Sequence, residues 1–293
     1  MEARRGRSAT TSCFVRPRRG PDGGRPVSAG APSLVDLHNH LVPAVDDGAR
    51  TVEEAIATLR EFAALGVRRV ATTPHLAASR ATGPRMRGVV ESFAELRSAA
   101  AESVPEIELS LGFEVRLDEP DAELSDPALG LGERHLLVEF SMLMMPAYPV
   151  ATLETAIGQG WIPVLAHPER YAGVAARYPM VATWREAGAL MCVNSGSLQG
   201  LYGREAEWVA RRMLADGAVD LIASDNHARP GRSETVRAAW DWLVEGGFEP
   251  AARLLLRDNP AAVLEGRDPQ PVPPIDLADG WSERLRRLVG WSR

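Results

Sequence analysis

The sequence predicts an α/β fold in which seven parallel strands form a closed or nearly closed barrel. From Leu34 onward, short apolar runs rich in β-branched residues alternate with longer stretches whose apolar residues recur at helical spacing. This alternation is typical of parallel strands joined by right-handed helical crossovers. Because about seven such units occur and no glycine-rich dinucleotide-binding motif follows the first strand, a barrel is favoured over an open doubly wound sheet.

Most units of the repeat contribute one strand and one helix. The expected strands, in chain order, are Leu34–His38, Arg68–Thr72, Glu108–Phe113, Leu136–Phe140, Ile162–Ala166, Leu190–Val193 and Leu221–Ala223. The expected helices are Val52–Leu65, Met86–Ser103, Tyr148–Gln159, Met180–Ala187, Arg204–Asp216 and Glu234–Glu245. Thr51 followed by Glu54 forms a capping box, which predicts where the first helix begins.

Two segments lie outside the repeat, so the barrel domain is expected over residues 34–266. Residues 1–33 are rich in Arg, Gly, Pro and Ser without periodicity, and we expect a disordered basic arm that is dispensable for activity. Residues 267–293 begin as a Pro-rich linker and continue into a short amphipathic helix. The apolar face of this helix carries Trp281, Leu285, Leu288 and Val289.

Composition excludes several classes of function. All 33 basic residues are arginine, which removes phosphate-loop NTPases, Schiff-base and pyridoxal enzymes, and hydrolases that bridge two metals with a carbamylated lysine. The net charge of −6 leaves an acidic body once the arginine-rich arm is set aside, which argues against a nucleic-acid partner. The chain has neither an apolar run of ~20 residues nor a secretory signal, so we expect a cytoplasmic protein without membrane insertion. Cys13 and Cys192 are expected to be incidental thiols.

Potential metal ligands occur at the ends of most expected strands, where functional residues gather in barrels of this kind. Five of the six histidines fall at strand ends, and only His135, at the start of the fourth strand, does not. Each candidate alone could be a capping or paired residue, but burying so many ionisable groups together is costly unless cations compensate them. The ligand candidates are His38, His40, His75, Glu114, Glu139, His167, Asp225 and His227.

The types of ligand narrow the choice of ion and of reaction. Imidazole and carboxylate ligands without a thiolate suit Mn²⁺, Fe²⁺ or Zn²⁺ in a catalytic site. Three or four ligands per ion would accommodate two or three ions with Glu114 as a bridge, and such a cluster activates water and clamps the oxygens of a phosphoester. Arg170 and Arg229 lie within three positions of candidate histidines, and either could grip a phosphate or form an ion pair with a carboxylate such as Glu169.

These segments resemble the PHP (polymerase and histidinol phosphatase) superfamily. More narrowly, they resemble the bacterial tyrosine-protein phosphatases that accompany capsular and exopolysaccharide kinases. The motifs concerned are Val35–His40, Val45–Gly48 with Thr51 and Glu54, Thr73–His75, Glu139–Ser141, Ala166–Tyr171 and Ser224–His227. The resemblance covers roughly Leu34 to Gly266 and implies a distorted (β/α)7 barrel of the PHP type with a three-metal site.

The resemblance also implies how the ligands divide among the ions, for which manganese is expected, with iron or zinc as alternatives. The first ion would be held by His38, His40, Glu114 and Asp225. The second would be held by Glu114, Glu139 and His167, and the third by Asp47, His75 and His227. The two phosphate-gripping arginines of the family fall on Arg170 and Arg229, and Arg232 competes with Arg229 because the loop here is shorter than in the family.

The activity implied is that of a metal-dependent protein-tyrosine phosphatase. Its substrate would be the phosphotyrosine tail of a bacterial tyrosine kinase that controls capsule or exopolysaccharide synthesis. One alternative is a phosphatase of a small monoester such as histidinol phosphate, and another is a polymerase-associated nuclease, which the acidic body disfavours. A kinase regulator that binds phosphotyrosine without turnover is disfavoured by the intact ligand set. A homo-oligomer is compatible with the sequence.

Overall fold

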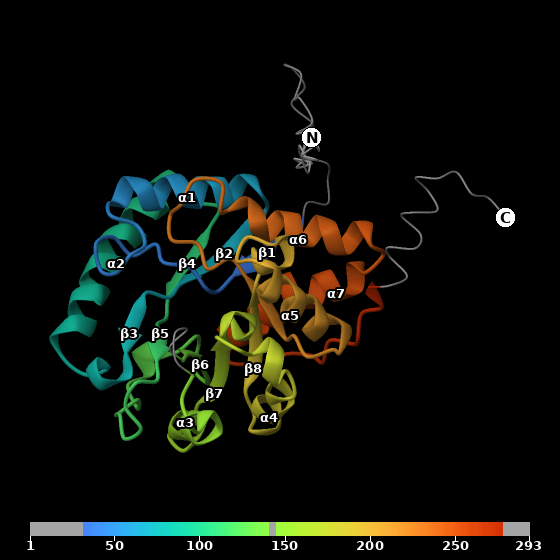
Figure 1. The fold of residues 1–293 in the computed structure, drawn as a ribbon. Coiled ribbons are helices and arrows are strands. Elements are labelled where there is room, and N and C mark those ends of the chain that lie inside the picture. Colours follow the sequence, from blue (N-terminus) through green and yellow to red (C-terminus); the bar gives the residue numbers. More distant parts are fainter. Residues whose placement is uncertain (1–31, 141–144, 278–293) are drawn as a thin grey trace, which may run out of the picture. The chain divides into compact units, whose positions relative to one another are not determined.

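The computed structural model describes residues 32–140 and 145–277, in which strands and helices alternate along the chain (Figure 1). The strands are β1 (Leu34–Asp36), β2 (Val67–Thr72), β3 (His75–Ala77), β4 (Glu108–Leu111), β5 (Glu114–Arg116), β6 (His135–Glu139), β7 (Ile162–Ala166), β8 (Leu190–Asn194) and β9 (Leu221–Ala223). The helices are α1 (Val52–Ala64), α2 (Pro84–Ser103), α3 (Pro149–Ile157), α4 (Met180–Glu186), α5 (Arg204–Ala215), α6 (Glu234–Glu245), α7 (Glu249–Arg253) and α8 (Asn259–Leu264).

Every strand pairing is parallel, which confirms the predicted α/β fold with parallel strands. One sheet has the order β1-β2-β4, and the other has the order β3-β5-β6-β7-β8-β9. Short 3₁₀ turns punctuate the connections. They are η1 (Ala78–Arg80), η2 (Pro127–Leu129), η3 (Pro168–Arg170), η4 (Ala175–Arg177) and η5 (Ser197–Gln199).

Two of the seven predicted strands, which correspond to β2 and β4, are each followed after a short gap by a second strand that was not predicted, β3 or β5. Pro74, which has no backbone N–H, separates β2 from β3, and Gly112 lies in the gap between β4 and β5. Hydrogen bonds continue across both gaps, from Gly112 N to the Thr72 oxygen at 3.0 Å and from Glu114 N to the Pro74 oxygen at 3.1 Å. The same two stretches of chain therefore take part in both sheets.

The ends of the first and last strands also lie side by side. Asp225 N donates to the His38 oxygen and His40 N to the Asn226 oxygen, both at 2.8 Å, and Asn39 forms a parallel bridge with Asn226. These bonds place the segments that follow β1 and β9 next to each other. The potential ligands of both segments are thereby brought to one end of the strands.

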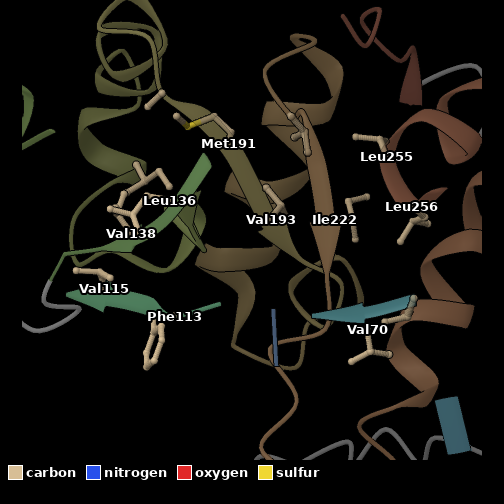
Figure 2. Close-up of a cluster of buried hydrophobic side chains, with 14 of the residues drawn as sticks. Val70, Phe113, Val115, Leu136, Val138, Met191, Val193, Ile222, Leu255 and Leu256 are labelled. Atoms are coloured by element: carbon tan, nitrogen blue, oxygen red, sulfur yellow. The ribbon is translucent and has the colours of Figure 1, made fainter. Parts of the chain in front are cut away.

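Alternate residues along the strands contribute to two different hydrophobic clusters, as the pleat of a strand requires. One cluster lies between strands and helices; it includes Val138 on β6, Val193 on β8, and Leu255 and Leu256 near α7 (Figure 2). The intervening residues form a smaller cluster to which both sheets contribute. Its members include Leu37, Ala71, Leu137, Val164, Ala166, Cys192, Leu221 and Ala223. The two sheets therefore share one interior.

The six predicted helices are present, and their bounds agree to within about two residues. Thr51 caps α1 by accepting a hydrogen bond from Glu54 N at 3.3 Å. Helices α7 and α8, with the π-helical turn η6 (Leu254–Asp258) between them, were not predicted. Their prolines, Pro250 and Pro260, sit in the first helical turn, where proline is tolerated, rather than marking a break.

Residues 1–31, which hold most of the predicted N-terminal arm and Cys13, lie outside the described residues. Residues 278–293, which hold the predicted C-terminal helix, also lie outside them. The segment just after the predicted barrel boundary packs on the core, because Val272 and Ile275 are buried and Ile275 N donates to the Leu214 oxygen. Cys192 is a buried free thiol. None of the helices over the described residues is long and apolar enough to cross a membrane.

Candidate metal centre

The nine predicted ligands are brought together at one end of the strands. They come from the segments after β1, β7 and β9, from the first residue of β3 and of β5, from the last residue of β6, and from the loop before α1. In that order they are His38, His40, His167, Asp225, His227, His75, Glu114, Glu139 and Asp47. His135 begins β6 and lies apart from these groups, as expected.

Glu114 is the centre of the cluster and is fully buried. Its Oε1 lies 3.2 Å from His38 Nε2 and 2.8 Å from His167 Nε2. Its Oε2 lies 2.8 Å from His75 Nδ1 and 3.4 Å from His40 Nε2. One carboxylate thus faces four imidazoles, which is the arrangement needed for a ligand that bridges two ions.

Four groups of side chains have ligand atoms within 4.8 Å of one another. They are His38 with His40 and Asp225; His38 with Glu114 and His167; His75 with Glu114 and Glu139; and His40 with Asp47, His75 and His227. The first and last groups follow the first and third implied sets. His75 and His167 each lie 2.8 Å from an oxygen of Glu114. His75 is slightly closer to Glu139, because His75 Nδ1 is 3.5 Å from Glu139 Oε1 whereas His167 Nε2 is 3.8 Å from Glu139 Oε2.

The buried atoms of this cluster fit divalent ions. Several of its nitrogens and one carboxylate oxygen are buried without a hydrogen-bond partner, a condition that costs free energy unless something else satisfies them. These atoms are His38 Nδ1 and Nε2, His40 Nε2, His75 Nδ1, His167 Nδ1 and Glu114 Oε2. His75 Nδ1 and Glu114 Oε2 lie 2.8 Å apart, but they do not have the geometry of a hydrogen bond. Imidazole and carboxylate ligands without thiolate suit Mn²⁺, Fe²⁺ or Zn²⁺.

Electrostatics in the cluster favour added positive charge. Burial acts to lower the pKa of His75, yet its interactions with Glu114 and Glu139 raise that pKa to about 11. Burial likewise acts to lower the pKa of His40, but hydrogen bonds with Asp225 and Asp46 raise that pKa to about 9. Burial acts to raise the pKa of Asp225, but the charge of a neighbouring histidine keeps it well below its usual range. At His40 and His75 the carboxylates therefore favour the protonated imidazole when no other cation balances their charge.

Asp46 orients His40 and was not predicted as a site residue. Its Oδ2 lies 2.8 Å from His40 Nδ1 and accepts a hydrogen bond from His75 N at 3.0 Å, while its Oδ1 accepts from Gly48 N at 3.0 Å. With Nδ1 held this way, Nε2 of His40 is turned toward the cluster. Gly48 is required for the close turn, because a Cβ there would lie 2.0 Å from the His40 oxygen.

Buried polar contacts also fix the two strand ends that carry most of the ligands. Asp36 accepts hydrogen bonds from Ser224 N at 2.7 Å, Ser224 Oγ at 2.8 Å and Asn39 Nδ2 at 2.9 Å, and so joins the segments after β1 and β9. His167 and Asp225 both adopt left-handed backbone conformations, with φ of 37° and 52°. Such strain in residues with side chains is uncommon and clusters at functional sites.

A hollow of about 270 Å³, which we call the phosphate pocket, opens over the cluster. Its lining residues are Asp47, His75, Glu139, His167, Arg170, Tyr202, Asp225, His227, Arg229 and Arg232. All three candidate arginines thus face the same space as the potential ligands. Tyr202 was not predicted, because no motif marks it and only the fold brings η5 and α5 to this edge.

Arg170 makes the strongest contacts of the three arginines. Its Nη1 lies 2.5 Å from Asp225 Oδ2, and its guanidinium stacks on the Tyr202 ring at 4.0 Å. The guanidinium of Arg232 lies 5.7 Å from the same ring, and its Nη1 is buried without a hydrogen-bond partner. Arg229 Nη2 donates to the backbone carbonyl oxygen of Asp47 at 3.3 Å.

Arg170 forms an ion pair with a carboxylate, as the alternative allows, but its partner is Asp225 and not Glu169. Glu169 is buried and instead accepts hydrogen bonds from Ser197 Oγ at 2.6 Å and from Asn194 N at 3.1 Å. Asn194 in turn donates through Nδ2 to Asp225 Oδ2 at 2.7 Å. Arg170 is consequently held over the cluster by a potential metal ligand rather than turned away from it.

Known bacterial proteins resemble this chain over most of its length. It is 27% identical over 256 residues to tyrosine-protein phosphatase YwqE of Bacillus subtilis (strain 168), covering 82% of this chain and 96% of that protein. Against tyrosine-protein phosphatase CpsB of Streptococcus pneumoniae it is 28% identical over 240 residues, covering 79% and 98%. A solved structure, from a pair described as YwqE and CpsB of these species and as unique metal-dependent tyrosine phosphatases, matches with a TM-score of 0.71 and 25% identity, covering 83% and 100%.

These relatives agree with the resemblance inferred from the strand-end motifs. The family described as capsular polysaccharide synthesis, CpsB/CapC, matches residues 34–265. That range begins at β1 and ends just after α8, so it contains all nine potential ligands and all three candidate arginines. The chain therefore belongs to the CpsB/CapC family.

Proposed function

We propose that this chain is a metal-dependent protein-tyrosine phosphatase. Its substrate is the phosphotyrosine tail of a bacterial tyrosine kinase that controls capsule or exopolysaccharide synthesis. The observation that carries the proposal is the phosphate pocket, where a buried imidazole and carboxylate cluster meets three arginines over one hollow. The names of the family relatives, YwqE and CpsB, support the choice of phosphotyrosine over other phosphoesters.

The nine residues of the cluster would hold two or three divalent ions, with manganese expected. When bound, such ions lower the pKa of a bound water and stabilise charge on the oxygens of a phosphoester. The ligand atoms are those of His38, His40, Asp47, His75, Glu114, Glu139, His167, Asp225 and His227. Within the chain, Glu114 would offer both of its oxygens as ligands, and the contact of Asp46 with Nδ1 of His40 leaves Nε2 of that ring facing the cluster.

The arginines bind and orient the phosphate. A guanidinium matches two phosphate oxygens with its fork of N–H groups, so Arg170 and Arg229 hold the equatorial oxygens over the cluster. Arg170 shifts from Asp225 Oδ2 to the incoming phosphate, and the Tyr202 ring supports it from the other side. The unsatisfied Nη1 of Arg232 makes this residue the rival of Arg229 for the second position.

The two sheets are parts of one distorted (β/α)7 barrel of the PHP type over residues 34–266. This is supported by their shared interior cluster, by the two interrupted strands and by the bonds between the segments after β1 and β9. Residues 1–33 and 267–293 are not counted in this domain, although Val272 and Ile275 pack on its core. A barrel of this kind explains why ligands that are distant in the sequence converge at one end.

A substrate panel tests the function. The Mn²⁺-loaded protein is assayed for phosphate release from a phosphotyrosine peptide, from histidinol phosphate and from an oligonucleotide with a terminal phosphate, and His167→Ala serves as the inactive control. We expect release from the peptide by the natural chain alone, and loss of that activity on chelation. Release only from histidinol phosphate would replace this proposal with the small-monoester phosphatase. Equal rates for the natural chain and His167→Ala would instead favour a binding role.

A further inference from the structure

A second hollow of about 270 Å³, here called the flanking hollow, adjoins the phosphate pocket. It is lined by Gly48, Arg50, Glu54, Ala57, Thr58, Glu61, His227, Ala228, Arg229 and Pro230. His227 and Arg229 line both hollows, so the two spaces meet across these side chains. Figure 1 shows the corresponding arrangement of the chain, with the loop after β9, in orange, running alongside α1.

The walls of the flanking hollow are held in place by the fold. Ala228 has a φ of 53°, and the following Pro230 has a ring that restricts its own φ. Arg229 N donates to Asn226 Oδ1 at 3.1 Å, and its side chain reaches the Asp47 oxygen. The opposite wall is one side of α1. A recess that is already formed in this way can bind a ligand without a large ordering cost.

The charges in the flanking hollow leave one carboxylate without a partner. Arg50 Nη2 and Glu54 Oε1 lie 2.5 Å apart, so these two charges satisfy each other. Glu61 is exposed, and its carboxylate makes no hydrogen bond or ion pair with any residue that the structure describes. The far end of the hollow, where Glu61 lies about two turns along α1 from Glu54, therefore presents an unpaired negative charge.

We propose that the flanking hollow binds a residue next to the phosphotyrosine of a peptide substrate and favours a lysine or arginine that pairs with Glu61. The inference rests on the proposed function and deepens it, because a small monoester would fill the phosphate pocket alone. A peptide must continue beyond that pocket, and the flanking hollow is the neighbouring space that shares its walls. Contacts in the flanking hollow would therefore be made by a peptide substrate and not by a small phosphate monoester.

Two substitutions perturb the flanking hollow without touching a potential ligand or an arginine of the phosphate pocket. Glu61→Arg reverses the unpaired charge, and Ala57→Trp fills the space from the exposed side of α1. Matched controls on α2 are Glu102→Arg and Ala94→Trp, at exposed positions that line neither hollow. Both controls make the same chemical change on a neighbouring helix.

Binding is measured by fluorescence anisotropy in Mn²⁺ with peptides that carry a non-hydrolysable phosphonate mimic of phosphotyrosine. The peptides differ only in having lysines or glutamates within three residues of the mimic. We expect the natural chain to bind the lysine peptide about fivefold more tightly, as for one exposed ion pair. Glu61→Arg should abolish or reverse this preference, and Ala57→Trp should weaken both peptides. For p-nitrophenyl phosphate, kcat/KM should change less than about twofold in either variant.

Equal binding of the two peptides by the natural chain would overturn the inference, as would Glu61→Arg behaving like Glu102→Arg. A variant that loses p-nitrophenyl phosphate turnover in proportion to peptide binding would also overturn it, since the residue would then act on the whole site. The binding assay does not depend on turnover. A Glu61-dependent preference in a protein that fails to hydrolyse phosphotyrosine would uphold the flanking hollow and reject the phosphatase.

Discussion

Replacing Asp46 with asparagine isolates what one carboxylate does for the candidate metal centre, because it removes a charge and changes few atoms. The two oxygens of Asp46 serve His40 Nδ1 and the backbone N–H groups of His75 and Gly48. An asparagine has one acceptor oxygen and one NH2 group, so at least one of these N–H donors loses its acceptor in either amide orientation. When the NH2 faces His40, the ring carries its proton on Nε2 and cannot coordinate an ion there.

The magnitude follows from burial and charge. Burial acts to raise the pKa of Asp46, but its hydrogen bond to His40 and the charge of that ring bring the pKa from 3.8 down to about 2. At about 1.4 kcal/mol per pH unit, this corresponds to about 2 kcal/mol in the metal-free protein. Loss of an acceptor for one buried N–H gives a similar cost of about 1–3 kcal/mol. Because the folded-state pKa is lowered, the stabilisation is present above about pH 4 and is lost as the pH falls toward 2.

We therefore expect Asp46→Asn to lose about 2 kcal/mol of unfolding free energy at pH 7 and to bind Mn²⁺ about 10- to 100-fold more weakly. Urea denaturation of the chelated protein measures the first quantity, and calorimetric titration with Mn²⁺ measures the second. Asp241→Asn is the control, because Asp241 is 45% exposed, pairs with Arg237 on the surface and should matter by less than about 0.5 kcal/mol. If both variants behave alike in both assays, Asp46 does not orient His40.

Three further predictions concern the site and the chain ends. Arg170→Ala should lower kcat on a phosphotyrosine peptide by about 10²- to 10³-fold, and Arg170→Lys should not restore it because it lacks the planar fork; recovery by lysine would show that charge alone suffices. The pKa of His40 is raised to about 9 and that of His75 to about 11, so both rings carry the extra proton of an imidazolium at pH 7. Mn²⁺ binding should release these protons, which calorimetric titrations in buffers of different ionisation enthalpy measure. Binding without proton release would contradict this prediction. Removing residues 1–31 should leave kcat/KM unchanged within about twofold, and a larger loss in a folded protein would assign the arm a role in activity.

The strand and helix order could be predicted because apolar periodicity in each segment reflects its burial. The interruptions could not be predicted. The second expected strand stopped before Pro74 and the third ran through Gly112, and only pairing with neighbouring strands shows that β3 and β5 continue beyond these residues. The C-terminal helices were missed for a related reason. Pro250 and Pro260 resemble breaks in the sequence, whereas each occupies a first helical turn where the missing N–H costs nothing.

The potential ligands could be predicted because they stand at fixed places on strands, and parallel strands bring their ends together whatever the details of the loops. Residues that support the ligands depend on contacts between distant segments. Asn194 reaches Asp225 only because β8 lies beside β9, and Tyr202 reaches Arg170 only through the turn after η5. Asp46 belongs to one of the motifs quoted above, but the sequence could not show whether Asp46 or Asp47 contacts Nδ1 of His40.

Asp225 contacts both the residues proposed to bind ions and the arginine proposed to bind phosphate. Its Oδ1 lies 3.5 Å from His38 Nε2 and 3.4 Å from His40 Nε2, whereas its Oδ2 faces Arg170 and Asn194. A carboxylate divided in this way would offer Oδ1 as a metal ligand, while Oδ2 holds the Arg170 guanidinium over the cluster. A bound phosphate would compete with Oδ2 for that guanidinium. The left-handed backbone at Asp225 points the short side chain between both partners. A glutamate has one more methylene and could not keep both oxygens in place, so Asp225→Glu should weaken ion binding and phosphate binding together, whereas Arg170→Ala should weaken the second alone.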